Sequence, residues 1–260
     1  MNNRALITGS SSGIGLAYAR YLSKKGWNLD LISYDNTRSE RSEIELNYKK
    51  ASFFIADLSK IESIKNIVDN FETPDLIVAN AGIAINGSIG KLTRAEKEDA
   101  YYLMCGGVID LIEGFVPRMI DKGSGRIVII SSIGAITAMP KSSIYSSIKS
   151  GVHAYGRSIS AELKDSGISV TVSMPGYVRT SAHKRAGLDH LEKKVPGWMW
   201  MNAEDVVKET EKASQAGKAE IIPGKVYKIT KPFLKFESAI NVWKKICLLY
   251  TSPSPRDLAV

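Results

Sequence analysis

The sequence predicts an α/β protein in which one parallel sheet of about seven strands is covered by helices on both faces. Through most of the 260 residues, short apolar runs alternate with longer segments of helical periodicity. Several of the runs are almost entirely apolar, as strands buried on both faces are. No internal repeat or linker interrupts the alternation before about residue 224. We therefore expect a single, doubly wound domain.

The first half of the chain contains four expected strands, and helical segments separate them. The strands cover residues 4–9, 28–33, 51–57 and 74–82, and the helices cover residues 13–26, 41–50 and 58–71. Gly26 is expected to end the first helix, whose apolar stripe consists of Ile14, Ala17, Tyr18, Tyr21 and Leu22. Ser59 is available as the cap of the third helix.

The second half continues the alternation. Residues 93–123 read as one or two helices, and further helices are expected at 142–167 and 202–217. The corresponding strands are residues 125–132, 168–176 and 219–224. Residues 177–201 are irregular and rich in glycine, proline and tryptophan.

Composition excludes several classes of protein. Hydrophobic content of 44% and charged content of 24% are ordinary for a globular protein. Two cysteines cannot build a disulfide framework, and three scattered histidines show no metal-ligand spacing. No apolar run reaches the ~18 residues of a membrane span. Because the chain begins directly with a strand-like segment, we expect no signal peptide. We expect a cytoplasmic protein without a metal site.

The net charge of +8 is concentrated late in the chain. Residues 225–246 hold six lysines against one glutamate, a net +5 that leaves +3 for the rest. The rest therefore does not resemble a nucleic-acid-binding protein. The basic segment is either a solvated tail or a weak membrane-surface patch, because Phe233, Phe236, Ile240 and Trp243 recur among its lysines at helical spacing.

Residues 247–260 do not continue the preceding pattern. The stretch "CLLYTSPSPRD" has no periodicity and matches one reading frame of a common sequencing-library adapter. We expect these residues to be a non-native tail and exclude them from the fold.

A glycine-rich loop joins the first strand to the first helix. It reads "TGSSSGIG", with Gly9, Gly13 and Gly15 in a strand–turn–helix setting. Glycine allows a tight turn and a close approach of the backbone to a phosphate, which the helix N-terminus attracts. The alternative is a purely structural turn. The spacing G-x-x-x-G-x-G differs from the common dinucleotide fingerprint.

Three tyrosine–lysine pairs share a spacing of four residues: Tyr21 with Lys25, Tyr145 with Lys149, and Tyr227 with Lys231. A lysine one helical turn from a tyrosine favours the phenolate and lowers the tyrosine pKa. Only the "YSSIK" pair follows a strand that ends in serine, thirteen residues upstream at Ser132. The Ser132 hydroxyl could stabilise a developing alkoxide, and Ser131 is the neighbouring alternative.

These motifs together resemble those of the short-chain dehydrogenase/reductase family. "TGSSSGIG", "NAG" at 80–82, "YSSIK" and "PGYVRT" at 175–180 occur in the order and at the intervals of its main oxidoreductase subtype, over residues 3 to 224. The resemblance implies a single Rossmann-type domain over residues 1–224. It also implies an NAD(P)(H)-dependent oxidoreductase that transfers a hydride between nicotinamide and a ketone or secondary alcohol. Ser132, Tyr145 and Lys149 would be catalytic, with Tyr145 as proton donor or acceptor.

The resemblance also implies a set of cofactor-binding residues at the carboxyl ends of the strands. They are Gly9, Ser11, Ser12, Gly13, Ile14, Gly15, Ser33, Asp57, Leu58, Asn80, Ala81, Gly82, Tyr145, Lys149, Pro175, Gly176, Val178 and Thr180. Ser33 occupies the position at which an acidic residue selects NAD, and Arg38 follows nearby. We therefore favour NADP(H) over NAD(H), although Asp35 could suit NAD.

Several expectations concern departures from the family or its variable parts. Met104 stands where many members have an asparagine that supports the lysine, which indicates either a variant proton relay or weakened catalysis. The alternative function is therefore a cofactor-binding regulatory or scaffold protein. Residues 177–201 would form a substrate lid, with Trp198, Met199, Trp200 and Met201 as a pocket wall or a packing contact. A homodimer or homotetramer is usual in the family.

Overall fold

The computed structural model describes residues 3–34, 50–85, 89–139, 141–180 and 195–233. A seven-stranded sheet of order β3-β2-β1-β4-β5-β6-β9 forms its centre. Every neighbouring pair in it is parallel. The predicted doubly wound α/β domain is therefore confirmed. The sheet consists of β1 (Arg4–Thr8), β2 (Asn28–Ser33), β3 (Ala51–Ile55), β4 (Leu76–Ala79), β5 (Gly125–Ile130), β6 (Ile168–Ser173) and β9 (Glu220–Ile221).

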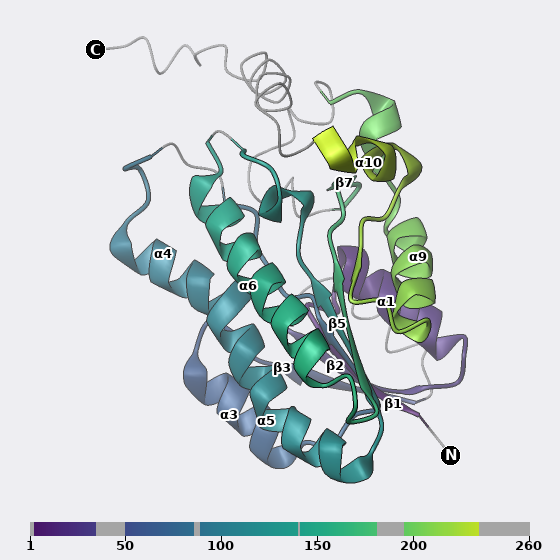
Figure 1. Ribbon diagram of the computed structural model, residues 1–260. Coiled ribbons are helices and arrows are strands. Elements are labelled where there is room, and N and C mark those ends of the chain that lie inside the picture. The colour runs from purple at the N-terminus through teal and green to yellow at the C-terminus, as the bar shows by residue number, and fades with distance from the viewer. Residues whose placement is uncertain (1–2, 35–49, 86–88, 140, 181–194, 234–260) are drawn as a thin grey trace.

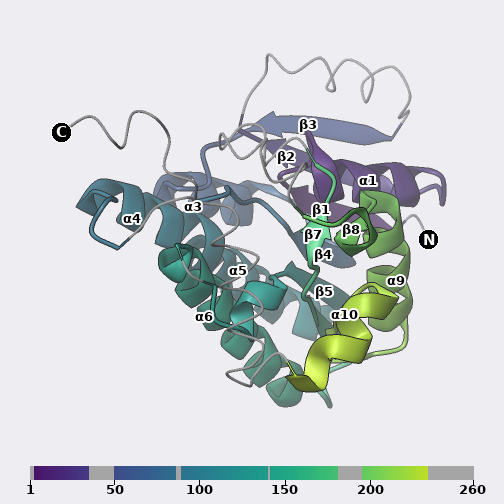
Figure 2. The same cartoon turned by 90° about the horizontal axis from the view of Figure 1, so that it is seen from above.

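Helices cover both faces of this sheet (Figures 1 and 2). One face carries α3 (Ile61–Asn70), α4 (Arg94–Tyr101), α5 (Gly107–Lys122) and α6 (Ser143–Glu162). The other carries α1 (Gly13–Ser23) and α9 (Ala203–Gln215). None of the helices in the described ranges is both long enough and apolar enough to cross a membrane.

Alternation along the strands divides the core between these two faces. Leu6, Ile77 and Ile127 belong to the cluster beneath α3, α5 and α6, whereas their neighbours Ile7 and Val78 belong to the cluster beneath α1 and α9. Successive side chains of a strand point to opposite faces, so apolar runs are what a sheet covered twice requires.

Residues 93–123 form a continuous helical stretch with an irregular middle. Thr93 and Glu96 make a capping box at the start of α4. A π-helical turn, Tyr102–Gly106, then joins α4 to α5, and Gly123 ends α5 in the left-handed conformation with φ of 69°. A π-turn inserts extra backbone into a helix and often lies at a functional site.

The observed helices are shorter than predicted, as α1 and α3 illustrate. The first helix ends at Ser23, and residues 24–26 form a turn that closes at Gly26. Ser59 does not cap α3, which has Lys60 as its N-cap and starts at Ile61. The Ser59 hydroxyl instead donates to the Asp57 carboxylate at 2.7 Å, so it belongs to the turn before the helix.

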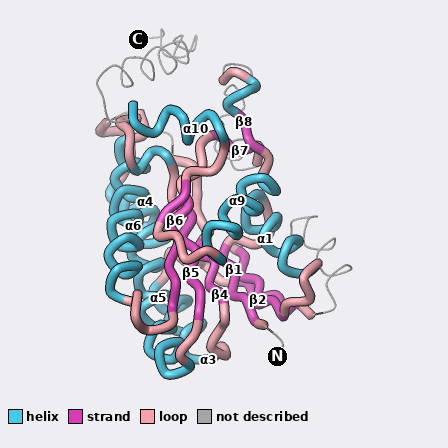
Figure 3. Tube along the Cα trace, turned by 45° about the vertical axis from the view of Figure 1, so that its right-hand side comes forward, coloured by secondary structure: helices cyan, strands magenta, loops and turns pink. Residues whose placement is uncertain are grey.

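The segment between β6 and α9 contains a two-stranded sheet in its described parts. Here β7 (Tyr177–Val178) pairs in parallel with β8 (Trp200–Met201), which follows a short 3₁₀ turn at Gly197–Met199. After β9, the short helix α10 (Lys225–Thr230) and a 3₁₀ turn, Lys231–Phe233, follow. Figure 3 shows β7, β8 and α10 gathered at one end of the main sheet. The predictions for residues 41–49, Asp35, Arg38 and 234–260 lie outside the described residues.

Candidate active site

The glycine loop passes over the carboxyl end of β4. Gly9 has a φ of 65°, and a Cβ atom added to it would lie 2.8 Å from the Cα of Ala81. A Cβ on Gly15 would lie 2.2 Å from the carbonyl oxygen of Gly9. Asn80 fixes the loop from β4, because its side-chain amide donates to the carbonyls of Thr8 at 2.9 Å and Gly9 at 3.2 Å. Only glycine permits this close passage of backbone.

The N-terminus of α1 opens from this loop. Gly13 begins the helix with a φ of 56°, and a Cβ on it would lie 3.0 Å from the Thr180 side chain. The side chain of its N-cap residue, Ser12, makes no capping hydrogen bond to the helix. The first turn of a helix offers N–H groups and a positive dipole end. The arrangement is therefore suited to an anionic group such as a diphosphate.

Ser132, Tyr145 and Lys149 come together beside the end of β5. Ser132 is the N-cap of the 3₁₀ turn Ile133–Ala135, where its oxygen accepts from the Gly134 N–H at 3.1 Å. Its side chain is also hydrogen-bonded to Tyr145. The Lys149 ammonium lies 5.9 Å from the centroid of the Tyr145 ring and donates to the Ile130 carbonyl at 3.0 Å. All three sequence-predicted catalytic residues thus share one location.

Burial dominates the electrostatics of this group. It raises the pKa of Tyr145 above its ordinary value, and the hydrogen bond with Ser132 offsets part of the effect. It lowers the pKa of Lys149 to about 8, because the ammonium has left water. The tyrosine is therefore protonated at neutral pH and can donate a proton.

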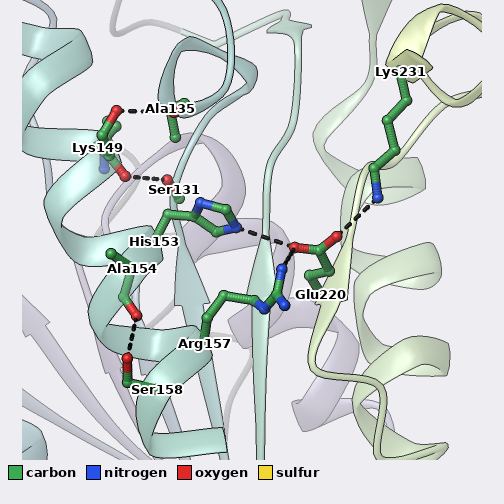
Figure 4. Close-up of polar contacts among 10 residues, drawn as sticks. Ser131, Ala135, Lys149, His153, Ala154, Arg157, Ser158, Glu220 and Lys231 are labelled. Carbon is green, nitrogen blue, oxygen red and sulfur yellow. Dashed lines mark hydrogen bonds and ion pairs between the residues drawn. The ribbon is translucent and has the colours of Figure 1, made fainter. Parts of the chain in front are cut away.

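Two serines fix α6 relative to β5 (Figure 4). The Ser131 hydroxyl donates to the backbone carbonyl of Lys149 at 2.9 Å, and the Ser150 hydroxyl donates to the Ala135 carbonyl at 2.9 Å. Ser131 and its neighbour Ser132 therefore face different groups. Ser131 contacts the helix backbone, whereas Ser132 contacts the tyrosine.

Met104 lies in the π-turn and is 1% exposed. It packs in a small apolar cluster with Ala100 and Ile148, against which Tyr145 also rests. A Cβ on Gly82 would lie 3.3 Å from its sulfur atom. Many members of the short-chain dehydrogenase/reductase family carry asparagine at this position. Here an apolar side chain takes its place and packs between α4, α6 and the end of β4.

The remaining predicted cofactor residues lie at the same edge of the sheet. Ser33 ends β2 and is 8% exposed, and the Asp57 carboxylate after β3 accepts from the Ser59 N–H at 2.9 Å. The Pro175 carbonyl after β6 accepts from the Ile133 N–H at 3.0 Å, which connects this loop to the serine turn. Carboxyl ends of parallel strands are where an open α/β sheet binds its ligand.

The other two tyrosine–lysine pairs have different surroundings. Lys25 lies 5.9 Å from the ring centroid of Tyr21 on α1, away from Ser132. Tyr227 is 3% exposed, and its hydroxyl contacts the backbone of Tyr177 and Met199 beside the predicted nicotinamide end of the site. Tyr227 falls within the basic segment 225–246, yet it is buried. Lysines at positions 225, 228 and 231 surround it in the sequence, so no local pattern predicts its burial.

Comparisons with known proteins agree with this geometry. The model of the family described as short chain dehydrogenase matches residues 3–190. D-beta-hydroxybutyrate dehydrogenase of Rhizobium meliloti is 31% identical over 204 residues, which cover 75% of this chain and 76% of that protein.

Solved structures share the fold. A short-chain dehydrogenase from Sphingobium yanoikuyae in complex with NADPH has a TM-score of 0.78 at 23% identity, over 97% of each chain. A 4-hydroxyisoleucine dehydrogenase complexed with NADH has a TM-score of 0.77 at 20% identity, covering 85% of this chain and 97% of that one. The family match and the sequence relative carry the conclusion: this chain belongs to the short-chain dehydrogenase family.

Proposed function

We propose that the protein is a nicotinamide-dependent oxidoreductase that interconverts a ketone and a secondary alcohol. The observation that carries the proposal is the convergence of Ser132, Tyr145 and Lys149 beside a glycine loop and a helix N-terminus that suit a dinucleotide diphosphate. The family supplies the reaction class, because its named relative is a dehydrogenase.

The close approaches at Gly9 and Gly15 and the N-terminal N–H groups and positive dipole end of α1 fit a dinucleotide. Residues 9–15 would bind its diphosphate, Asp57 and Leu58 would border the adenine, and Asn80, Ala81 and Gly82 would support the loop from β4. Pro175, Gly176, Val178 and Thr180 would hold the nicotinamide end. When bound, the nicotinamide ring donates or accepts the hydride.

The chain's own residues handle the proton. The Ser132 hydroxyl binds the substrate oxygen and orients it toward Tyr145. The Tyr145 hydroxyl, kept protonated by burial, donates its proton to that oxygen during reduction and accepts one during oxidation. The Lys149 ammonium favours the phenolate that remains, and it is held in place by the Ile130 carbonyl.

We propose NADP(H) as the preferred cofactor over NAD(H). The reason is that β2 ends in Ser33, so the carboxylate that would bind a 2′-hydroxyl and repel a 2′-phosphate is missing from this position. Relatives of the fold bind NADPH in one case and NADH in another. Parallel titrations with NADPH and NADH measure the preference, and tighter binding of NADH would contradict it.

Substitution Tyr145→Phe tests the enzymatic proposal. Turnover is measured with NADPH and NADH on a panel of ketones that includes 3-oxo acids, because one relative is named for a 3-hydroxy acid. We expect the variant to lose turnover by a factor of about 10²–10⁴ while it still binds cofactor, because only the proton donor is removed. Substitution Tyr21→Phe, in a pair of equal spacing outside the site, is the matched control. A Tyr145→Phe variant with wild-type turnover would refute the assignment.

A further inference from the structure

Tyr227 of α10 joins two segments that the chain separates by about twenty residues. Its hydroxyl donates to the Met199 carbonyl at 2.6 Å and accepts from the Tyr177 N–H at 3.0 Å. The residue is 3% exposed, so both hydrogen bonds lie away from water. One side-chain oxygen therefore links the loop after β6 to the segment that precedes β8.

The ring of Tyr227 also fixes the position of Gly176. A Cβ atom added to Gly176 would lie 2.0 to 2.4 Å from three carbon atoms of that ring. Backbone and ring can come this close only because residue 176 has no side chain. The ring thus forms a wall behind the Gly176 backbone.

The two segments that Tyr227 joins are already paired with each other. Tyr177 and Trp200 are partners in the β7–β8 ladder, and their rings lie 5.4 Å apart. The Arg179 N–H donates to the Met201 carbonyl at 2.9 Å. Each strand of this small sheet has only two residues. The two hydrogen bonds of Tyr227 are additional contacts between the same two segments.

The helix that carries Tyr227 is anchored to the main domain. The Glu209 carboxylate on α9 accepts from the Gly224 N–H at 3.3 Å and forms an ion pair with Lys228. At the other end of α10, Lys231 pairs with Glu220 of β9 at 2.8 Å. These contacts hold α10, and Tyr227 with it, against α9 and β9.

We infer that Tyr227 is a positioning residue for the nicotinamide end of the cofactor site. It would act through the Gly176–Val178 backbone, because both hydrogen bonds of its hydroxyl are made to backbone groups. The inference rests on the proposed function, which assigns that loop to the nicotinamide half of the dinucleotide. The adenine would bind beside Asp57 and Leu58 and the diphosphate at the glycine loop, and neither of the Tyr227 hydrogen bonds given above reaches these residues.

Substitution Tyr227→Phe removes the hydroxyl and keeps the ring, and dissociation constants are then measured by calorimetry. The probes are NADPH, NADH and the corresponding fragments that lack nicotinamide, 2′-phospho-ADP-ribose and ADP-ribose. We expect the variant to bind the full dinucleotide about 5–10-fold more weakly, as loss of one or two hydrogen bonds would cause. Binding of the fragment should remain within twofold. Substitution Tyr155→Phe is the matched control and should alter neither, because it removes a hydroxyl of α6 that donates to Glu113 of α5.

The outcomes separate the inference from the function on which it rests. Equal weakening of dinucleotide and fragment, or no weakening of either, overturns the positioning role. Wild-type protein that binds neither NADPH nor NADH overturns the proposed function, and the inference with it.

If Tyr227→Phe does not fold, amide hydrogen exchange in the wild-type protein replaces the comparison. The Tyr177 amide, which donates to Tyr227, should exchange more slowly with the dinucleotide bound than with the fragment bound. Equal exchange rates in the two complexes would overturn the positioning role.

Discussion

At the scale of single residues, the main feature of the site is Lys149, whose ammonium group is buried. Its side chain is 6% exposed, and the carbonyl of Ile130 accepts a hydrogen bond from its ammonium. A charge in such a place costs stability unless it is compensated. Enzymes commonly accept that cost where a group must act on a proton near neutral pH.

The stability of the cofactor-free protein should therefore depend on the pH through Lys149. Its pKa falls from 10.5 when unfolded to about 8 when folded. Between these values the unfolded state binds more protons, so the free energy of unfolding rises as the pH increases from about 8 to 10.5. Relative to Lys149→Met, the wild type should gain on the order of 2–3 kcal/mol over this range. Urea unfolding at several pH values measures the difference, and parallel curves for the two proteins would contradict it. Exposed Lys65→Met serves as the matched control.

The residues of the glycine loop and of "YSSIK" could be singled out from sequence because their chemistry requires fixed types at fixed spacings. Ser131 and Met104 could not be interpreted in the same way. Whether a serine faces a tyrosine or a helix carbonyl depends on how α6 packs on β5, and the apolar surroundings of Met104 depend on three elements far apart in the chain. The contacts of Tyr227 could not be predicted for the same reason, since its partners are backbone groups of Tyr177 and Met199 and not a sequence motif.

At the scale of elements, α9 is fixed to the sheet by a buried ion pair. Arg126 at the start of β5 contacts Glu211 of α9 at 2.8 Å, and it also donates to the Ser214 hydroxyl at 3.1 Å. The Glu211 side chain is 1% exposed. Removing one partner of such a pair leaves the other charge buried without compensation.

Substitution Arg126→Met should consequently destabilise the protein by about 3 kcal/mol. The methionine keeps much of the apolar volume but leaves the Glu211 carboxylate without its cation. The matched control is Arg94→Met, which breaks an exposed i,i+4 pair with Glu98 and should cost less than ~0.5 kcal/mol. Urea unfolding of both variants gives the comparison, and equal losses would show that burial of the Arg126 pair contributes nothing.

Strands and helices were predictable as elements because their apolar periodicity reflects the two covered faces of the sheet. The strand residues 219–224 were identified in this way although β9 contains only two residues. The π-turn at Tyr102–Gly106 and the β7–β8 pair had no such signal. The β7–β8 pair forms because two segments separated along the chain meet, and a local pattern does not record such contacts.

At the scale of the whole molecule, Glu220 connects three parts of the chain (Figure 4). This residue of β9 accepts from His153 at 3.1 Å and from Arg157 at 3.0 Å, both on α6, and it pairs with Lys231 beyond α10 at 2.8 Å. The edge strand, the catalytic helix and the helix that carries Tyr227 are therefore tied to one carboxylate.

These partners outweigh desolvation, which alone would raise the pKa of Glu220, and they lower it from 4.5 to about 2. A carboxyl group with a depressed pKa stabilises the folded state above pH 4.5, and that contribution is lost as the pH falls toward 2. Because water reaches part of this network, we expect Glu220→Gln to cost only about 1–2 kcal/mol at pH 7. The difference from wild type should shrink below pH 4.5 and approach zero near pH 2. Urea unfolding at pH 7, 4 and 3 measures it, with Glu98→Gln as the exposed control. A difference that stays constant with pH would mean that the glutamine changes packing and that the charge of Glu220 does not hold these elements together.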